Sequence, residues 1–204
     1  MALSLGEQFG QIDIYLFDQI LRRRIVRPMR VLDAGCGFGR NLIYFLREGY
    51  DLYAVDSDRD AVAEVRSLAA TLAPQLPAAN IREEQVEHMS FPDASVDVVV
   101  SSAVMHFARD EAQFEAMLTS MWRVLVPGGV FFCRLASSIG MADRVTPLGG
   151  RRFRLPDGTS RFLVDEPMLL ALTRGLGGAL LDPLKTTVVQ DQRAMTTWVV
   201  RKAD

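Results

Sequence analysis

The chain has 204 residues, a mass of 22.7 kDa, a formal net charge of −2 and 49% hydrophobic residues, values typical of one globular domain over residues 1–204. The weak charge argues against a nucleic-acid partner, and no apolar run approaches the ~20 residues that a membrane-spanning helix needs. The two cysteines, Cys36 and Cys133, and the absence of a basic and then apolar leader favour a cytoplasmic protein without a disulfide framework or metal site.

The first predicted element is an amphipathic helix over residues 8–26, within an N-terminal helical cap over residues 1–28 that ends at Pro28. From residue 30 onward, short apolar runs alternate with amphipathic segments, which is typical of strands that alternate with helices. The predicted strands cover residues 30–34, 51–56, 80–83, 96–101 and 130–135. The predicted helices between them cover residues 39–49, 58–72 and 110–125.

The C-terminal part departs from this alternation. A helix predicted over residues 165–175 precedes two strands, 179–184 and 196–201, whose short link indicates an antiparallel pair. Residues 136–164 form an insert or hairpin after the fifth strand, with a turn at Asp157-Gly158. The predicted fold class is therefore α/β: a doubly wound, mostly parallel, seven-stranded Rossmann-like sheet with an antiparallel final strand.

Three glycines, Gly35, Gly37 and Gly39, follow the first strand in the segment RVLDAGCGFGRN. Ligands of α/β sheets bind beyond the carboxyl ends of the strands, and glycine allows a ligand to approach the backbone closely. The G-x-G-x-G spacing differs from the dinucleotide fingerprint G-x-G-x-x-G. Asp33 would also repel a pyrophosphate, whereas it suits a ligand with an ammonium group. These features disfavour a nicotinamide-dependent oxidoreductase.

The segment VLDAGCGFGRN closely resembles the first motif of class I S-adenosylmethionine-dependent methyltransferases. YAVDSD, FPDASVDVVVSSAVMHF and MWRVLVPGG resemble later motifs of the same family, in the same order, so that the resemblance covers residues 29–135. The segments GRN, after the glycines, and REGY, at the end of the next predicted helix, resemble those of small-molecule methyltransferases of the tellurite-resistance type. The resemblance implies S-adenosyl-L-methionine as cofactor and methyl transfer to a small-molecule acceptor, with an anionic acceptor as one option.

The resemblance also implies roles for individual residues. Asp33 would hold the amino group of the cofactor, and Asp56 would accept its ribose hydroxyls, because an ionised carboxylate accepts several donors. Arg40 would either pair with the cofactor carboxylate or lie in solvent. Gln85 would accept from the adenine amine, with Glu84 as the competing assignment. The other residues expected beside the cofactor are Gly35, Cys36, Gly37, Gly39, Ser57, Val86 and Ser101.

Methyl transfer depends mainly on alignment of the acceptor and exclusion of water, with a general base where the acceptor is not already anionic. His106 is the catalytic candidate, and its alternative is a packing role in its loop. Tyr15 and Met105 are candidate substrate contacts that also fit the core. Arg154 would bind an anionic substrate, unless it lies on a solvated hairpin face.

Two alternatives to a small-molecule methyltransferase stay open: a non-catalytic S-adenosylmethionine-binding regulatory module and a methyltransferase that acts on a macromolecule. The absence of a basic surface signal ranks the second of these lower. No pattern in the sequence indicates an oligomeric state or the atom that accepts the methyl group.

Overall fold

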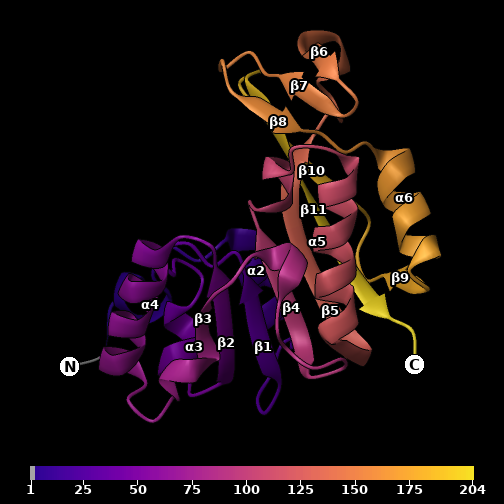
Figure 1. Ribbon diagram of the computed structural model, residues 1–204. Helices are drawn as coiled ribbons and strands as arrows, with labels where there is room; N and C mark the ends of the chain where they lie inside the picture. Colours follow the sequence, from indigo (N-terminus) through magenta and orange to yellow (C-terminus); the bar gives the residue numbers. More distant parts are fainter. Residues whose placement is uncertain (1–2) are drawn as a thin grey trace.

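The computed structural model describes residues 3–204 (Figure 1), so the first two residues of the predicted N-terminal cap lie outside the described part. The strands of the main sheet are β1 (Arg30–Ala34), β2 (Asp51–Asp56), β3 (Ile81–Glu83), β4 (Val96–Ser102), β5 (Leu125–Ser137), β9 (Gly178–Leu180), β10 (Lys185–Val189) and β11 (Arg193–Lys202). The α-helices are α1 (Leu5–Phe9), α2 (Ile14–Leu21), α3 (Ile43–Arg47), α4 (Arg59–Leu72), α5 (Glu111–Val124) and α6 (Glu166–Gly175). Short 3-10 turns follow β3 and β4: η2 (Val86–His88) and η3 (Met105–Phe107).

The main sheet has the order β10-β11-β5-β4-β1-β2-β3, and β9 also pairs with β11. The pairs from β5 to β3 are all parallel, whereas β11 is antiparallel to β5. The predicted sheet with an antiparallel final strand is therefore confirmed. The predicted strand 179–184 is wrong in its second half, because Pro183 lacks an N–H and the chain pairs again only at Lys185. β9 and β10 thus share one edge of β11.

Helices cover both faces of this sheet, as the doubly wound class requires. Val98 and Val100 of β4 pack into one buried cluster and Val99 into the other, because successive strand residues point to opposite faces. The cluster of Val99 includes buried side chains of α5 and α6, and the cluster of Val98 includes those of α2, α3 and α4. Within residues 3–204, no helix is long and apolar enough to cross a membrane.

The N-terminal segment forms two helices instead of the single predicted helix over residues 8–26. Gly10 separates them with φ +60 and ψ −137, which favours glycine. A Cβ atom built at Gly10 would also lie 2.5 Å from Cδ1 of Ile43. Apolar periodicity continues through this break, which is why the pattern alone predicted one helix. Asp13 then caps α2 by accepting the N–H of Tyr15.

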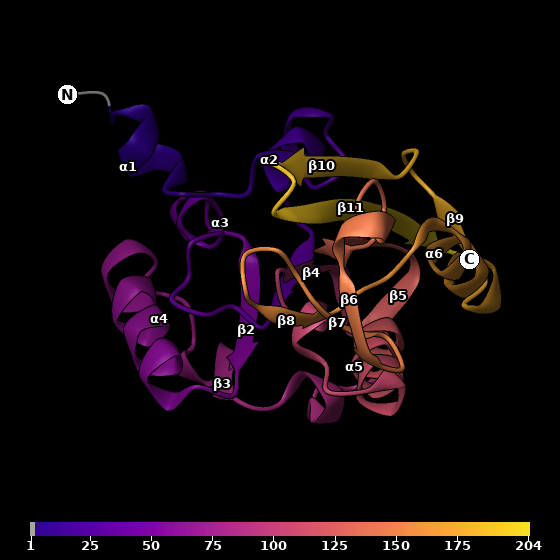
Figure 2. The ribbon, with the colours of Figure 1, turned by 90° about the horizontal axis from the view of Figure 1, so that it is seen from above.

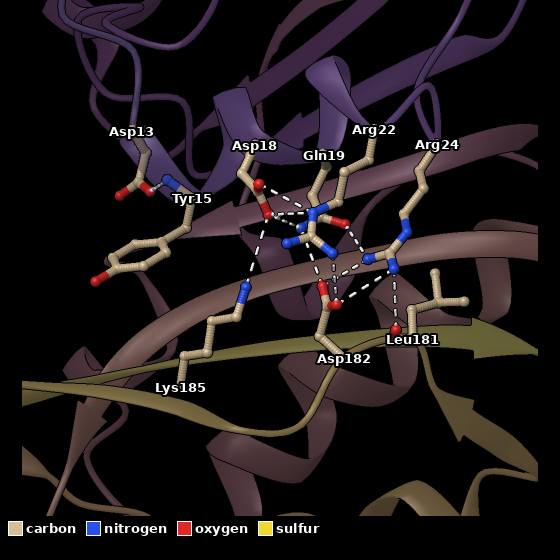
Figure 3. Close-up of polar contacts among 9 residues, drawn as sticks. All are labelled: Asp13, Tyr15, Asp18, Gln19, Arg22, Arg24, Leu181, Asp182 and Lys185. Carbon is tan, nitrogen blue, oxygen red and sulfur yellow. Dashed lines mark hydrogen bonds and ion pairs between the residues drawn. The ribbon is translucent and has the colours of Figure 1, made fainter.

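A cluster of ion pairs and hydrogen bonds attaches α2 and the residues after it to the segment that joins β9 to β10 (Figure 3). Asp182 accepts from Arg24 Nη1 at 2.5 Å and from Gln19 Nε2 at 3.2 Å. Lys185 Nζ lies 3.7 Å from Asp18 Oδ2. These contacts hold the second half of α2 beside the C-terminal strands.

The predicted insert contains a second, antiparallel sheet of β6 (Thr146–Gly149), β7 (Arg152–Arg154) and β8 (Ser160–Phe162), in that order. The expected turn at Asp157-Gly158 joins β7 to β8, with Gly158 at φ +82 and the Leu155 N–H donating to Thr159 O. This small sheet lies beyond the carboxyl end of β5 (Figure 1), and the view from above places it over the middle of the main sheet (Figure 2).

Candidate functional site

The glycine loop lies where β1 and β2 end side by side, with Ala34 opposite Val55. The backbone N–H groups of Gly35 and Cys36 both donate to Val55 O at 2.9 Å. Gly37 N–H donates to Asp56 Oδ2 at 2.8 Å, and Asp58 N–H donates to Asp56 Oδ1 at 2.9 Å. Each oxygen of Asp56 keeps a free lone pair for a further donor. The carboxylate therefore fixes the loop and can still bind a ligand.

A cavity of about 580 Å³ opens beside this loop, which is in the size range of small-molecule and cofactor sites. A Cβ atom built at Gly37 would meet no atom within 4 Å, whereas one at Gly35 would lie 2.5 Å from Cγ2 of Val104. The first glycine is therefore required by packing, and the second leaves room for a ligand. The lining residues are Gly35, Cys36, Gly37, Phe38, Arg40, Asn41, Asp56, Ser57, Gln85, Val86, Glu87, Ser102, Ala103, Val104, Phe107, Ala108, Gln113 and Met117.

Asp33 is buried behind the loop, at 2% exposure, and neither of its carboxylate oxygens has a hydrogen-bond partner among the described residues. The pKa of this carboxyl group is raised to about 7, mainly by burial, with the nearby Arg40 lowering it and the negative charge of Asp56 raising it. A buried carboxylate without a donor is costly. A ligand that brings a positively charged donor would remove this cost, so Asp33 fits the amino group of S-adenosylmethionine.

Most residues expected beside the cofactor do line this cavity: Gly35, Cys36, Gly37, Arg40, Asp56, Ser57, Gln85 and Val86. Asp33, Gly39 and Ser101 do not line it, and Asp33 lies buried behind the loop. A Cβ atom on Gly39 would lie 3.1 Å from Cγ2 of Val65, so this glycine allows α4 to pack closely. Ser101 is fully buried inside the sheet, and the next residue, Ser102, lines the cavity. Glu84 accepts the N–H and hydroxyl of Ser90, so the geometry favours Gln85 over Glu84.

Several lining residues were missed from the sequence, chiefly Phe38, Val104 and Phe107. Phe38 is 66% exposed and Phe107 is 59% exposed, although both side chains are large and apolar. A phenylalanine between two glycines of a ligand loop was the available signal for Phe38. Val104 and Phe107 follow β4, whose carboxyl end lies beside that of β1.

A second cavity of about 250 Å³ adjoins the first, and the two share Arg40 and Ala103. Four arginines line it, together with a single acidic residue and a histidine. The arginines come from the loop after β1, from β5, from β8 and from the start of β11, while the acid lies in the β7–β8 turn and the histidine in η3. The lining residues are Arg40, Ala103, His106, Arg134, Ala136, Leu155, Asp157, Thr159, Arg161, Val189, Arg193 and Met195.

His106 lies in this second cavity, where its geometry favours the alternative of a packing role over that of a general base. Its Nδ1 accepts the N–H of Ala136 at 3.2 Å. Burial lowers the pKa of His106 to about 4, with further lowering by Arg161 and Arg134. The ring is therefore neutral at pH 7, and because Nδ1 is an acceptor, the proton resides on Nε2. His106 can donate a hydrogen bond there but cannot take a proton.

The three residues predicted to contact substrate line neither cavity. The Tyr15 hydroxyl is 2.6 Å from Thr187 Oγ1, and its ring lies 5.6 Å from the guanidinium carbon of Arg134, which it supports from behind. Met105 is fully buried in the core. Arg154 is exposed on β7 and lies on the solvated hairpin face that was its alternative.

Asp13 is a buried acid that the sequence did not single out. Its Oδ2 lies 3.3 Å from Arg134 Nη1 and 3.6 Å from Arg40 Nη2, and its N–H donates to Asn41 Oδ1 at 2.9 Å. Ser102 Oγ connects the same groups, since it accepts from Arg40 Nη2 at 2.9 Å and donates to Asp13 at 3.4 Å. Asp13 therefore orients two arginines of the second cavity.

Residues 32–133, half of the chain, match the family model described as a methyltransferase domain. A probable S-adenosylmethionine-dependent methyltransferase of Mycolicibacterium smegmatis is 36% identical over 119 residues, which are 58% of this chain and 42% of that protein. The probable S-adenosyl-L-methionine-dependent methyltransferase TehB of Haemophilus influenzae is 30% identical over 101 residues, which are 46% of this chain and 32% of TehB. The chain thus spans less than half the length of these curated relatives.

A solved structure has the same fold: the 1,6-didemethyltoxoflavin-N1-methyltransferase of Burkholderia thailandensis, with bound 1,6-didemethyltoxoflavin and S-adenosylhomocysteine. Its TM-score is 0.71 at 21% identity, and the match covers 96% of this chain and 80% of that one. The family match covers β1 to β5, the part of the sheet that forms the glycine loop and positions Asp56. The chain belongs to the class I S-adenosylmethionine-dependent methyltransferases.

Proposed function

We propose that this chain binds S-adenosylmethionine in the larger cavity and transfers its methyl group to a small-molecule acceptor. The observation that carries the proposal is the buried carboxylate of Asp33, which lacks any donor within residues 3–204 and lies behind a loop that leaves room for a ligand at Gly37. When bound, S-adenosylmethionine supplies a methyl group activated by its sulfonium charge.

The residues of the larger cavity would then bind and orient the cofactor. Asp33 is the proposed partner of its amino group, and Asp56 accepts from its ribose hydroxyls with the lone pairs that the backbone leaves free. Gln85 and Val86 line the part of the cavity assigned to the adenine. Arg40 lines both cavities and is the proposed partner of the cofactor carboxylate.

The apolar rings at the first cavity would exclude water from the reacting groups. Phe38 and Phe107 are largely exposed in the free protein, so a ligand that covers them gains hydrophobic contact. Exclusion of water and alignment of the acceptor are the main contributions that a protein makes to this chemistry. No general base is assigned, because His106 donates at its only accessible nitrogen.

A small-molecule acceptor is supported by the modest size of the second cavity and by the small ligand bound in the Burkholderia thailandensis structure. The arginines of that cavity favour an acceptor with a negative charge.

Incubation with S-adenosylmethionine labelled in its methyl group, and with a small-molecule extract as the acceptor source, tests this function. Label is expected in the small-molecule fraction, and the Asp56→Ala variant should abolish it. RNA and protein are tested as alternative acceptors in separate incubations. If label appears only in RNA or in protein, the methyl acceptor is a macromolecule and the small-molecule proposal is wrong. Tight binding of S-adenosylhomocysteine without any transfer would instead indicate a regulatory module.

A further inference from the structure

The second cavity is lined by both cationic and apolar side chains. Arg40, Arg134, Arg161 and Arg193 line it, and Asp157 is the acid among its lining residues. Aliphatic and thioether side chains also line it, and these offer no strong hydrogen bonds to a charged group. These apolar residues are Ala103, Ala136, Leu155, Val189 and Met195.

The positive charges of this cavity exceed the negative charges that face them. Besides Asp157 in the lining, the buried Asp13 lies behind Arg134 and Arg40. Two carboxylates therefore face four guanidinium groups. Asp157 is itself engaged, because its Oδ1 accepts both the N–H and the hydroxyl of Thr159.

Several N–H donors of these arginines are free for a ligand. Arg134 Nε is buried and has no partner within the described chain. Arg161 donates to its neighbour Ser160 O at 2.9 Å and stacks over the Phe107 ring at 4.8 Å, while Arg193 forms no ion pair within residues 3–204. Phe107 also lines the cofactor cavity, so Arg161 is held at the border between the two cavities.

The charged and titratable side chains of this cavity are mainly hydrogen-bond donors, and Asp157 is the acid among them. His106 presents Nε2–H, because its Nδ1 already accepts from Ala136. Hydrogen bonds from Thr159 lower the pKa of the exposed Asp157, so this carboxylate stays ionised and is a weak base. A neutral methyl acceptor that must lose a proton would therefore find no strong base among the lining residues.

We propose that the second cavity binds the methyl acceptor as a small amphiphilic carboxylate, with its charge against Arg134, Arg161 and Arg193 and its apolar body against Leu155, Val189 and Met195. This assignment rests on the proposed function, since the acceptor role follows from the shared border at Arg40 and Ala103. Planar guanidinium groups bind carboxylates through paired hydrogen bonds, and the apolar side chains distinguish an organic anion from an inorganic one.

Calorimetry on the full chain saturated with S-adenosylhomocysteine tests the inference with simple probes. Benzoate and phenylacetate are compared with benzamide and phenylacetamide, which have similar shape and no charge, and with inorganic phosphate. The carboxylates should bind about ten-fold more tightly than the amides, the ratio expected for one charge-assisted contact. Phosphate should bind more weakly than benzoate, because it gains nothing from the apolar side chains.

Arg161→Gln and Arg193→Gln should each weaken carboxylate binding by about three- to ten-fold, because each removes one charged donor. Arg154→Gln is the matched control: it removes an arginine from the same small sheet, outside both cavities, and should leave carboxylate affinity unchanged. Affinity for S-adenosylhomocysteine, measured separately, should be the same in all three variants and shows that each is folded.

Equal binding of acids and amides, phosphate as tight as benzoate, or equal losses in all three variants would overturn the inference. The inference would also be overturned if no carboxylate binds at millimolar concentration while S-adenosylhomocysteine still binds. Failure of S-adenosylhomocysteine itself to bind would instead contradict the proposed function, so the two failures are distinguishable.

Discussion

The two neighbouring cavities are built in opposite ways. The larger one has Asp56 in its lining and the buried Asp33 behind its loop, and is formed by the glycine loop and the ends of adjacent parallel strands. The smaller one is rich in arginine and is formed by side chains from β5, η3, β11 and the hairpin between β7 and β8. Backbone geometry thus creates the first cavity, whereas convergence of distant side chains creates the second. Opposite charge in the two cavities suits two ligands that meet at their common border, one with an ammonium group and one with an anionic group.

The largest effect is expected from the buried charge of Asp33. Its pKa in the folded protein is about 7, against an ordinary value of 3.8, so the folded state binds more protons than the unfolded state between these values. Stability contributed by this group is fully present below pH 3.8 and is lost as the pH rises towards 7. The loss amounts to about 4 kcal/mol in the ligand-free protein, at 1.36 kcal/mol per pKa unit.

Urea unfolding of the wild type and the Asp33→Asn variant between pH 4 and pH 8 measures this effect. The variant should gain stability relative to the wild type as the pH rises, because the amide cannot ionise. S-adenosylhomocysteine should stabilise the wild type most at the high end of the range. A stability difference that does not change with pH would show that Asp33 is not an isolated buried charge.

A smaller effect is expected from Asp56, whose carboxylate is already held by two backbone N–H groups. Asp56→Asn should weaken binding of S-adenosylhomocysteine by about ten- to a hundred-fold, because hydrogen bonds to a charged acceptor contribute ~1.5–3 kcal/mol. Isothermal titration calorimetry gives the affinities. Asp51→Asn, at the other end of β2, is the control and should bind normally. Equal losses in both variants would exclude a specific role for Asp56.

The smallest expected change is the titration of His106, and it separates a donor from a general base. Its pKa of about 4 predicts that the ring stays neutral across the physiological range. Proton NMR of the ring C–H signals, with His88→Gln to assign the second histidine, follows this directly. A midpoint near 6.5 would reinstate His106 as a candidate base, since that is the value at which a solvated histidine titrates.

The first cavity could largely be predicted from the sequence, because its residues lie at fixed distances after predicted strand ends. The second could not. Arg193 lies in a segment predicted as a link, and Arg134 lies within a strand whose pattern indicates only burial. Asp13 was hidden inside a predicted continuous helix that Gly10 interrupts. Periodicity locates elements along the chain, but it does not show which distant side chains converge on one cavity.

The fold was likewise predicted in one part and missed in another. Strands β1 to β5 alternate with helices along the chain as predicted, because each parallel strand needs a crossover and each crossover has its own apolar pattern. The edge formed by β9 and β10 was only partly predicted, since both strands are short and Pro183 lies between them.

A crystal structure of the chain with S-adenosylhomocysteine tests the central claim most directly. The ligand should occupy the cavity beside the glycine loop, with its amino group bound to Asp33, directly or through one water, and its ribose hydroxyls on Asp56. A ligand-free cavity at saturating concentration, or a bound ligand whose amino group lies away from Asp33, would contradict the claim.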